Sequence, residues 1–345
     1  MMSDMENRLV LILTIFYNLY FLLAITSQIL LLFLMIKCRV RSLKDMKIYL
    51  FNTLVLQFIS TISAYLLQCR AVPSSDTMAL LCYGPCKYFG TIPCKVIFQI
   101  LETSLIACAT SLIIAFYYRY EMLTTNSFTR NRHYKQLVIS YGIPLVFLIF
   151  EVLSPSDLSK VAAELMALHP TYDIDSYTVL GFSEVKSVIA TIQTLLMMLG
   201  IYGTPFIALL FRSKIMKILN KTSKSYHAEK IEQTKSMIQV GCNLFLLVLP
   251  HRKPFLFQGL TLQTLLPLFC YVPSFTYYIY AQYTHSDSLV AEFAVSPFGF
   301  IYTIFDPLLT IYYVLPYRRT FNAIFRKHSV SNVTFIQSET TRRVI

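Results

Sequence analysis

A stretch of 28 residues without a single charged side chain, from Leu9 to Ile36, constrains this chain more than any other feature. About 20 consecutive apolar residues are enough for an α-helix to cross a bilayer. A cleaved signal peptide is the competing interpretation, but its apolar core runs over only about 7–15 residues. We therefore expect a retained membrane helix, which tilts or extends into the interface because it is longer than the bilayer requires.

Further apolar runs predict six more membrane helices. Charged residues make up 14% of the 345 positions, whereas soluble domains carry about 25%, so a soluble enzyme, a disordered chain and a coiled coil are excluded. We expect an all-α membrane protein, a seven-transmembrane helix bundle over residues 1–325, followed by a disordered cytoplasmic tail at 326–345. The predicted spans are 9–36, 48–67, 95–118, 137–153, 188–211, 256–279 and 288–315.

The distribution of lysine and arginine predicts the orientation of the bundle. Segments on the two sides of the predicted spans hold 22 and six of these residues. The side with more positive charge faces the cytoplasm, which places the N-terminus outside and the C-terminus inside. Topology and contact with membrane lipids then account for the net charge of +12, and we expect no nucleic acid partner.

Residues 240–258 interrupt the entry into the sixth span. Their apolar part, 240–250, has 11 residues, which is too short to cross a bilayer, and an eighth span would move the basic tail outside. The segment begins with a valine, whose codon starts with GT, and it ends with Phe-Leu-Phe-Gln, whose codons can form a pyrimidine-rich acceptor ending in CAG. We interpret these 19 residues as a translated intron, which predicts a disturbed sixth helix. A genuine loop of this protein is the alternative.

Several short motifs follow one another in a fixed order along the chain. They are Gln68–Pro73 (QCRAVP), Gly84–Gly90 (GPCKYFG), Tyr117–Tyr120 (YYRY), Gln263–Pro267 (QTLLP) and Asp306–Tyr312 (DPLLTIY). The ordered set resembles the nematode chemosensory serpentine receptors, most closely the class delta family. The resemblance implies a G-protein-coupled chemoreceptor for a small environmental or pheromone-like ligand. It also implies a role in sensory perception such as olfaction, in the plasma membrane of sensory-neuron cilia.

Two other functions compete with the receptor. A ligand-gated seven-helix cation channel, as in insect odorant receptors, has its N-terminus inside, which the charge distribution disfavours. A transporter usually shows repeated halves and broken helices, and the sequence shows neither. No arrangement of residues typical of an enzyme, a cofactor site or a metal site stands out, so we expect none of the three.

The first predicted outer loop is rich in cysteine, with Cys69, Cys82, Cys86 and Cys94. Four cysteines permit three pairings, and the sequence does not choose among them. The second outer loop, 154–187, contains no cysteine, so the bridge that usually joins this loop to the third span in rhodopsin-like receptors cannot form. We expect at least one disulfide within residues 69–94 and none that reaches residues 154–187.

Glu102 is the one acid well inside the third predicted span. A charge at such depth is costly and usually faces a cavity or a partner. Gln99 and Thr103 fall near the same face of the helix, so Gln99, Glu102 and Thr103 are the candidates for ligand binding. A structural glutamate bonded to another helix is the alternative.

Basic and aromatic side chains at the inner ends of the spans are candidates for contact with a heterotrimeric G protein, mainly through the resemblance. Anionic lipid headgroups are an alternative partner for the basic ones. The candidates are Arg119 and Tyr120 after the third span, Arg212, Lys214 and Lys217 after the fifth, and Arg318 after the seventh.

Asp306 and Pro307 lie inside the seventh predicted span. Proline frees a backbone carbonyl in a helix, and an aspartate beside it can hydrogen-bond at the resulting kink. A site for a sodium ion or a proton is the alternative interpretation.

Overall fold

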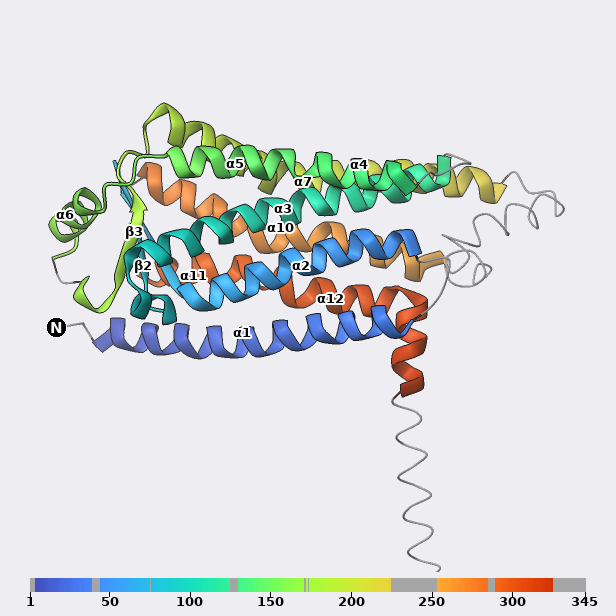
Figure 1. The fold of residues 1–345 in the computed structure, drawn as a ribbon, viewed down its shortest axis with the longest axis horizontal. Coiled ribbons are helices and arrows are strands. Elements are labelled where there is room, and N and C mark those ends of the chain that lie inside the picture. The colour runs from blue at the N-terminus through green and yellow to red at the C-terminus, as the bar shows by residue number, and fades with distance from the viewer. Residues whose placement is uncertain are drawn as a thin grey trace, which may run out of the picture.

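The computed structural model describes residues 4–38, 44–74, 76–124, 130–170, 172, 174–224, 253–284 and 289–324. Long helices lie side by side along one axis and form a bundle (Figure 1). They are α1 (Asp4–Lys37), α2 (Lys44–Leu67), α3 (Thr91–Thr124), α4 (Arg130–Ser140), α5 (Gly142–Leu153), α7 (Val188–Lys224), α10 (Lys253–Thr284), α11 (Leu289–Phe300) and α12 (Tyr302–Tyr313).

Six stretches of the described chain are long and apolar enough to cross a membrane. α10, with 32 residues, is also long enough to cross a membrane. It is not one of the six, because several tyrosines and two prolines lower its mean hydropathy. Each of the seven predicted spans overlaps at least one helix of the bundle, α10 included. The helical bundle is therefore confirmed. The six stretches are Met5–Lys37, Asp45–Leu67, Thr91–Thr124, Arg132–Leu153, Val188–Ile218 and Glu292–Tyr313.

Two predicted spans are each divided into a pair of helices. The fourth consists of α4 and α5, which meet at Tyr141, three residues before Pro144. Proline has no amide hydrogen to donate to the preceding turn, so the helix is weakest here. The seventh consists of α11 and α12, which meet at Ile301, just after Gly299, and glycine is a poor helix former.

A small antiparallel sheet covers the end of the bundle near the N-terminus (Figure 1). Its strands are β1 (Cys69–Pro73), β2 (Met78–Cys82) and β3 (Thr178–Phe182), in the order β1-β2-β3. Leu80 pairs with Ala71 on one side and with Leu180 on the other. The expectation of an all-α protein is therefore wrong at this end, where loops outside the bilayer satisfy their backbone hydrogen bonds by pairing as strands.

One glycine fixes how closely β3 approaches β2. Gly181 has a φ of +141°, and a Cβ atom added there would lie 1.8 Å from the carbonyl oxygen of Met78. Only glycine fits such a close approach without moving the backbone. Beside the sheet, the connecting loops contain α6 (Leu158–Leu168) and two 3-10 turns, η2 (Pro85–Phe89) and η3 (Ile174–Ser176).

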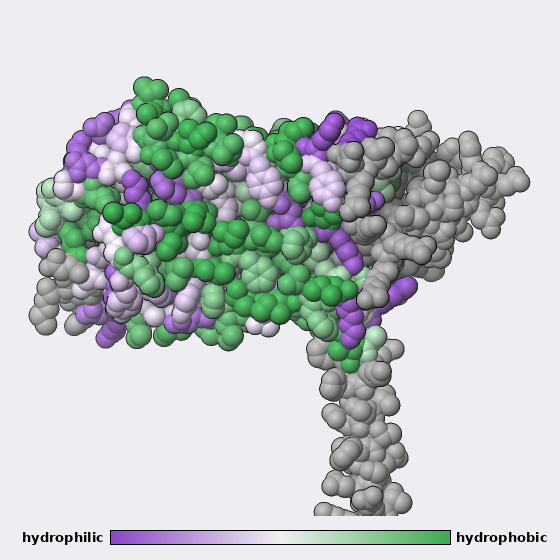
Figure 2. Space-filling model, viewed as in Figure 1, coloured by the Kyte–Doolittle hydropathy of each residue, from purple (hydrophilic) through white to green (hydrophobic). Residues whose placement is uncertain are grey.

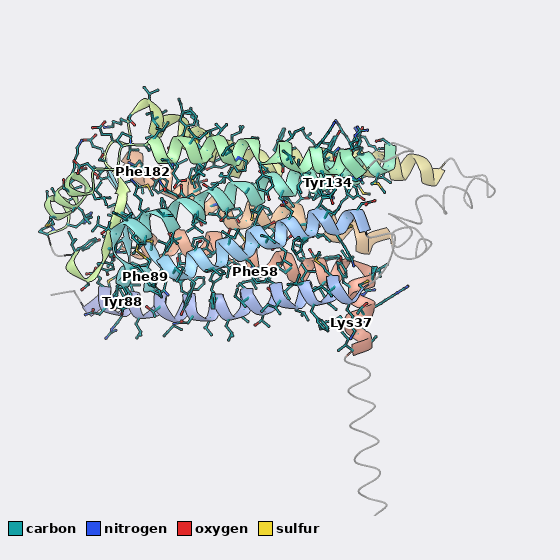
Figure 3. All side chains as sticks on the ribbon, viewed as in Figure 1. Lys37, Phe58, Tyr88, Phe89, Tyr134 and Phe182 are labelled. Carbon is teal, nitrogen blue, oxygen red and sulfur yellow. A yellow bond between two sulfur atoms is a disulfide. The ribbon has the colours of Figure 1, made fainter. Side chains whose placement is uncertain are left out.

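The surface of the bundle is typical of a protein in a bilayer. Hydrophobic side chains cover its middle, and hydrophilic ones gather towards the two ends (Figure 2). Exposed aromatic side chains also lie at both ends, with Tyr88 at the sheet end and Tyr134 on α4 towards the other (Figure 3). Tyrosine is enriched at the boundary between lipid and water, so these residues indicate the two membrane interfaces.

Part of the segment that we interpret as an intron is visible. Residues 253–258 form the beginning of α10, as regular helix in the backbone. Residues 240–252 and the predicted tail at 326–345 lie outside the described residues.

Candidate functional site

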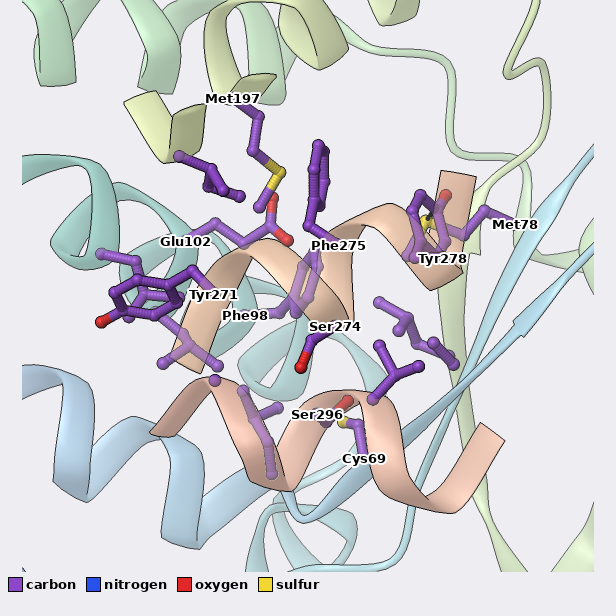
Figure 4. Close-up of a pocket in the computed structure, with 18 of the residues that line it drawn as sticks. Cys69, Met78, Phe98, Glu102, Met197, Tyr271, Ser274, Phe275, Tyr278 and Ser296 are labelled. Carbon is purple, nitrogen blue, oxygen red and sulfur yellow. Dashed lines mark hydrogen bonds between the residues drawn. The ribbon is translucent and has the colours of Figure 1, made fainter. Parts of the chain in front are cut away.

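A cavity of about 180 Å³ lies in the bundle next to the sheet. All three strands contribute to its wall, through Cys69 and Ala71 of β1, Met78 and Leu80 of β2, and Phe182 of β3. The remaining wall comes from α1, α2, α3, α7, α10 and α11 and from Val185 in the loop before α7 (Figure 4). The sheet therefore forms a lid between this cavity and the surroundings of the bundle.

The wall of the cavity is mainly aromatic and aliphatic. Glu102 is the one acid among the described residues that line it, and none of these is Lys, Arg or His. Its other polar side chains, apart from the tyrosines, are Gln193, Thr194, Ser274 and Ser296. The aromatic side chains are Tyr17, Phe98, Phe182, Tyr271, Phe275, Tyr278 and Phe300. A concave apolar site with a few polar groups is the usual form of a small-molecule site.

Of the three ligand-binding candidates that the sequence suggested, Glu102 lies in the wall of this cavity. The face of α3 that lines the cavity contains Phe98, Leu101, Glu102 and Leu105, at the spacing of one helical face. Gln99 and Thr103 are not among the lining residues. Of the three candidates, the rotation of α3 thus brings Glu102 to this cavity, and that rotation is set by the packing of neighbouring helices.

A second acid, Glu151 on α5, lies close to Glu102 and was not a candidate from the sequence. It is buried. Thr103 lies beside it, and both Glu102 and Lys95 are within electrostatic reach. Its position inside the apolar run of α5 was the available signal.

The four cysteines of the first loop form two bridges. Cys69 is bonded to Cys82, which joins β1 to β2 at paired positions of the sheet. Cys86 is bonded to Cys94, which joins η2 to the first turn of α3. Both bridges stay within residues 69–94, and neither reaches the second outer loop. The two bridges fix the sheet and the turn η2 next to the N-terminal end of α3.

A buried ion pair ties the sheet to the N-terminal helix. The Nη2 atom of Arg70 lies 2.8 Å from Oε1 of Glu6, and these side chains are only 1% and 2% exposed. The guanidinium carbon of Arg70 lies 4.5 Å from the ring centre of Tyr172, 5.0 Å from that of Tyr177 and 4.7 Å from that of Phe293. We call these five residues the outer clamp. It connects α1, β1, the loop 154–187 and α11.

Tyr177 strengthens this clamp as a hydrogen-bond donor. Its hydroxyl lies 3.3 Å from Oε1 of Glu6. Burial raises the pKa of Tyr177 well above the ordinary value of tyrosine, so the phenol keeps its proton at physiological pH and donates to the carboxylate.

The candidates for contact with a G protein lie at the opposite end of the bundle. Arg119 donates to Oε1 of Gln263 on α10 over 3.3 Å. Gln263 in turn donates to the hydroxyl of Thr310 on α12, also over 3.3 Å. Arg119 thus begins a chain of hydrogen bonds that joins α3, α10 and α12.

The other candidates surround this chain of hydrogen bonds. The ammonium of Lys214 lies 5.8 Å from the ring centre of Tyr120, which brings the inner ends of α3 and α7 together. Lys217 is exposed and Arg212 is half-buried. The guanidinium of Arg318 lies 5.9 Å from the ring centre of Tyr312. The exposed basic groups of α7 are thus accessible to a partner or to lipid headgroups.

Asp306 is held by a neighbouring helix. Gln57 donates to its Oδ2 atom over 2.8 Å, and Asp306 is buried. No cluster of three or more His, Cys, Asp or Glu side chains occurs among the described residues. The geometry around Asp306 favours a structural role, in which an interhelical hydrogen bond satisfies the carboxylate beside Pro307.

A smaller cavity of about 40 Å³ continues from the first towards Pro267. Leu105, Met197, Ile201 and Tyr271 line both cavities. Tyr271 on α10 thus stands between the outer cavity and the interior of the bundle, and no described residue is a hydrogen-bond partner of its hydroxyl.

Comparison with known proteins gives a consistent picture. The model of the family "Serpentine type 7TM GPCR chemoreceptor Srd" matches residues 13–240 and 251–323, and the break falls within the segment 240–258. The chain is 67% identical to serpentine receptor class delta-50 of Caenorhabditis elegans over 356 aligned positions that cover both proteins fully. It is 38% identical to class delta-51 of the same organism, covering 92% of this chain and 88% of that protein.

The fold has a counterpart among solved structures. Squid rhodopsin matches 91% of this chain and 84% of its own with a TM-score of 0.65 and 13% identity. At that identity the likeness concerns the fold alone.

Proposed function

Since this chain belongs to the Srd family of serpentine seven-transmembrane GPCR chemoreceptors, we propose that it binds a small environmental or pheromone-like molecule and activates a heterotrimeric G protein. The observation that carries the proposal is the lidded cavity of about 180 Å³ beside the sheet. Its wall combines an aromatic surface with one carboxylate, as a site for a small organic molecule requires.

The sheet end faces the outside of the cell in this proposal. The predicted inner segments hold 22 of the lysines and arginines against six outside, which supports an external N-terminus. Disulfides form in oxidising surroundings, and both bridges lie at the sheet end. The receptor then resides in the plasma membrane, in sensory-neuron cilia, with the lidded end of the cavity facing the environment.

α10 is the element that connects the two ends. Tyr271, Phe275 and Tyr278 line the cavity, and Gln263 receives the hydrogen bond of Arg119. Tyr271 and Gln263 are eight residues apart, or about 12 Å along the helix. Pro267 lies between them and is a point at which a helix can bend. A ligand that favours a different bend of α10 shifts the population of conformations and changes the contact with Arg119.

A ligand screen in cells that express the chain tests this proposal. Calcium imaging with a co-expressed promiscuous G protein is expected to find compounds that evoke a response, and cells without the chain are the control. The same compounds are expected to evoke nothing when the G protein is deleted. A ligand-evoked current that persists without any G protein contradicts the proposal and supports a channel.

A further inference from the structure

Glu102 and Glu151 stand apart from the other buried acids of the described bundle. Asp306 receives a hydrogen bond from Gln57, and Glu6 is paired with Arg70. Glu121 is paired with Arg132 and receives a second bond from Gln136, and Glu292 receives one from Tyr172. None of the described residues forms a hydrogen bond or an ion pair with Glu102, and the one side chain that can donate to Glu151 is Thr103 beside it. An acid without a partner at membrane depth is costly and usually faces a cavity or a binding partner, and Glu102 faces the cavity.

The two acids are neighbours, and one of them is accessible. Glu102 lines the cavity, whereas Glu151 does not. Lys95 lies within electrostatic reach of Glu151. The group therefore contains two carboxyl groups and one ammonium group. Like charges at close range cannot both ionise without a compensating cation. A positive group at Glu102 supplies this compensation from the side of the cavity.

The shape and composition of the wall restrict the cation further. Glu102 extends from α3 towards Met197 and Phe275, and Tyr271 and Tyr278 are presented by α10 (Figure 4). Aromatic rings attract an ammonium group through their faces. A cavity of roughly 150 Å³ holds one benzene molecule, so about 180 Å³ accepts a body of one ring or a short chain.

We propose that the cavity takes a small organic amine, with the ammonium on Glu102 and an apolar body of about one ring against the aromatic side chains. This inference rests on the proposed function, because it names the chemical class of the receptor's ligand. An amine supplies the positive charge that allows Glu102 to ionise beside Glu151, whereas a carboxylic acid or a neutral molecule of the same size does not supply it.

The test compares three probes of the same shape on the purified full-length protein in lipid nanodiscs. They are benzylamine, benzyl alcohol and benzoate. Their affinities are measured by isothermal titration calorimetry. A hydrogen bond to a charged group contributes about 1.5–3 kcal/mol, and about 1.4 kcal/mol corresponds to a factor of ten. Benzylamine is therefore expected to bind about 10- to 100-fold more tightly than benzyl alcohol, and benzoate more weakly than either.

Variants assign the preference to Glu102. Glu102→Gln is expected to lower the affinity for benzylamine to that for benzyl alcohol, and Glu102→Asp, which keeps the charge, to retain part of the preference even if Glu102→Gln fails to fold. Glu184→Gln removes the same charge from an exposed outer position and is expected to change the affinity less than about 2-fold. Equal affinity for amine and alcohol in the wild type, or a preference that survives Glu102→Gln, overturns the proposal.

The receptor proposal and the amine proposal fail separately. If benzylamine binds through Glu102 but no compound evokes a G-protein signal, the amine site stands and the receptor function is wrong. If a neutral compound evokes the same signal in the wild type and in Glu102→Gln, the receptor function stands and the amine is wrong.

Discussion

The outer clamp allows a stability prediction with a defined magnitude. Glu6→Gln removes the charge of the carboxylate but keeps its volume, and it leaves the guanidinium of Arg70 buried without a counter-ion. The two side chains are only 2% and 1% exposed, so water cannot take over the lost interaction. Removing one partner of a buried ion pair costs about 3–5 kcal/mol. We expect Glu6→Gln to destabilise the folded protein by about 3 kcal/mol.

The reverse change and the double variant refine this value. Arg70→Met also leaves a buried charge alone, on Glu6, and loses the contacts with three aromatic rings. In the double variant the charges of both Glu6 and Arg70 are gone, and an apolar side chain fills the place of the guanidinium. Residues in direct contact show interaction energies of about 0.5–3 kcal/mol. We therefore expect the double variant to cost about 2 kcal/mol less than the sum of the single ones.

Thermal unfolding of the protein in nanodiscs measures these differences. Cys108 and Cys270 are buried and free, so a thiol-reactive dye reports when the bundle opens. The matched control is the ion pair of Lys186 and Asp76. Its N–O distance of 2.7 Å is nearly the same, but its side chains are 74% and 63% exposed. Exposed pairs contribute about 0–1 kcal/mol, so Lys186→Gln is expected to unfold at almost the wild-type temperature.

The reasoning is refuted by two results. One is a Glu6→Gln variant that unfolds at the same temperature as Lys186→Gln, since burial then has no influence on the pair. The other is a double variant whose cost equals the sum of the single costs, since the two side chains then do not interact.

Four further outcomes are expected. Mass spectrometry without reduction is expected to find cross-linked peptides only within residues 69–94, and four free thiols there would contradict both bridges. Arg119→Ala is expected to weaken the G-protein response several-fold at normal surface abundance, because the link from α3 to α10 and α12 is lost; an unchanged response would leave Arg119 as a flank that sets topology. Tags at the two ends of the chain are expected to stain intact cells only at the N-terminus. Sequencing of the mature messenger RNA is expected to lack the codons for 240–258, and their presence would make this segment a genuine part of the protein.

The helices were predictable because membrane spans are encoded locally. Each apolar run is long enough to satisfy its own backbone within one helix, and hydropathy finds it without knowledge of its neighbours. The sheet was not predictable in the same way. Its strands have five residues each, and β3 lies about a hundred residues after β2, so their pairing depends on the assembled bundle.

The residues of the candidate site also divide into those recognisable from local sequence and those that depend on contacts between distant segments. Glu102 was found from its depth in an apolar run, which is a local property. Glu151 carried the same local signal inside the apolar run of α5 and was overlooked. The pair of Glu6 and Arg70 depends on contacts between distant segments, since the two residues are 64 positions apart. The rotation of α3, which decides that Glu102 lines the cavity and Thr103 does not, is likewise a result of packing.

The lid also affects the rates at which a ligand binds and dissociates. A wall built from β1, β2 and β3 and fastened by two disulfides stands between the cavity and the water, so a ligand enters and leaves through the same obstruction. An obstruction slows both directions by the same factor and leaves the dissociation constant unchanged. Changes in the lid that leave the residues lining the cavity in place therefore alter how long a response outlasts its stimulus, while the concentration that half-saturates the receptor stays the same.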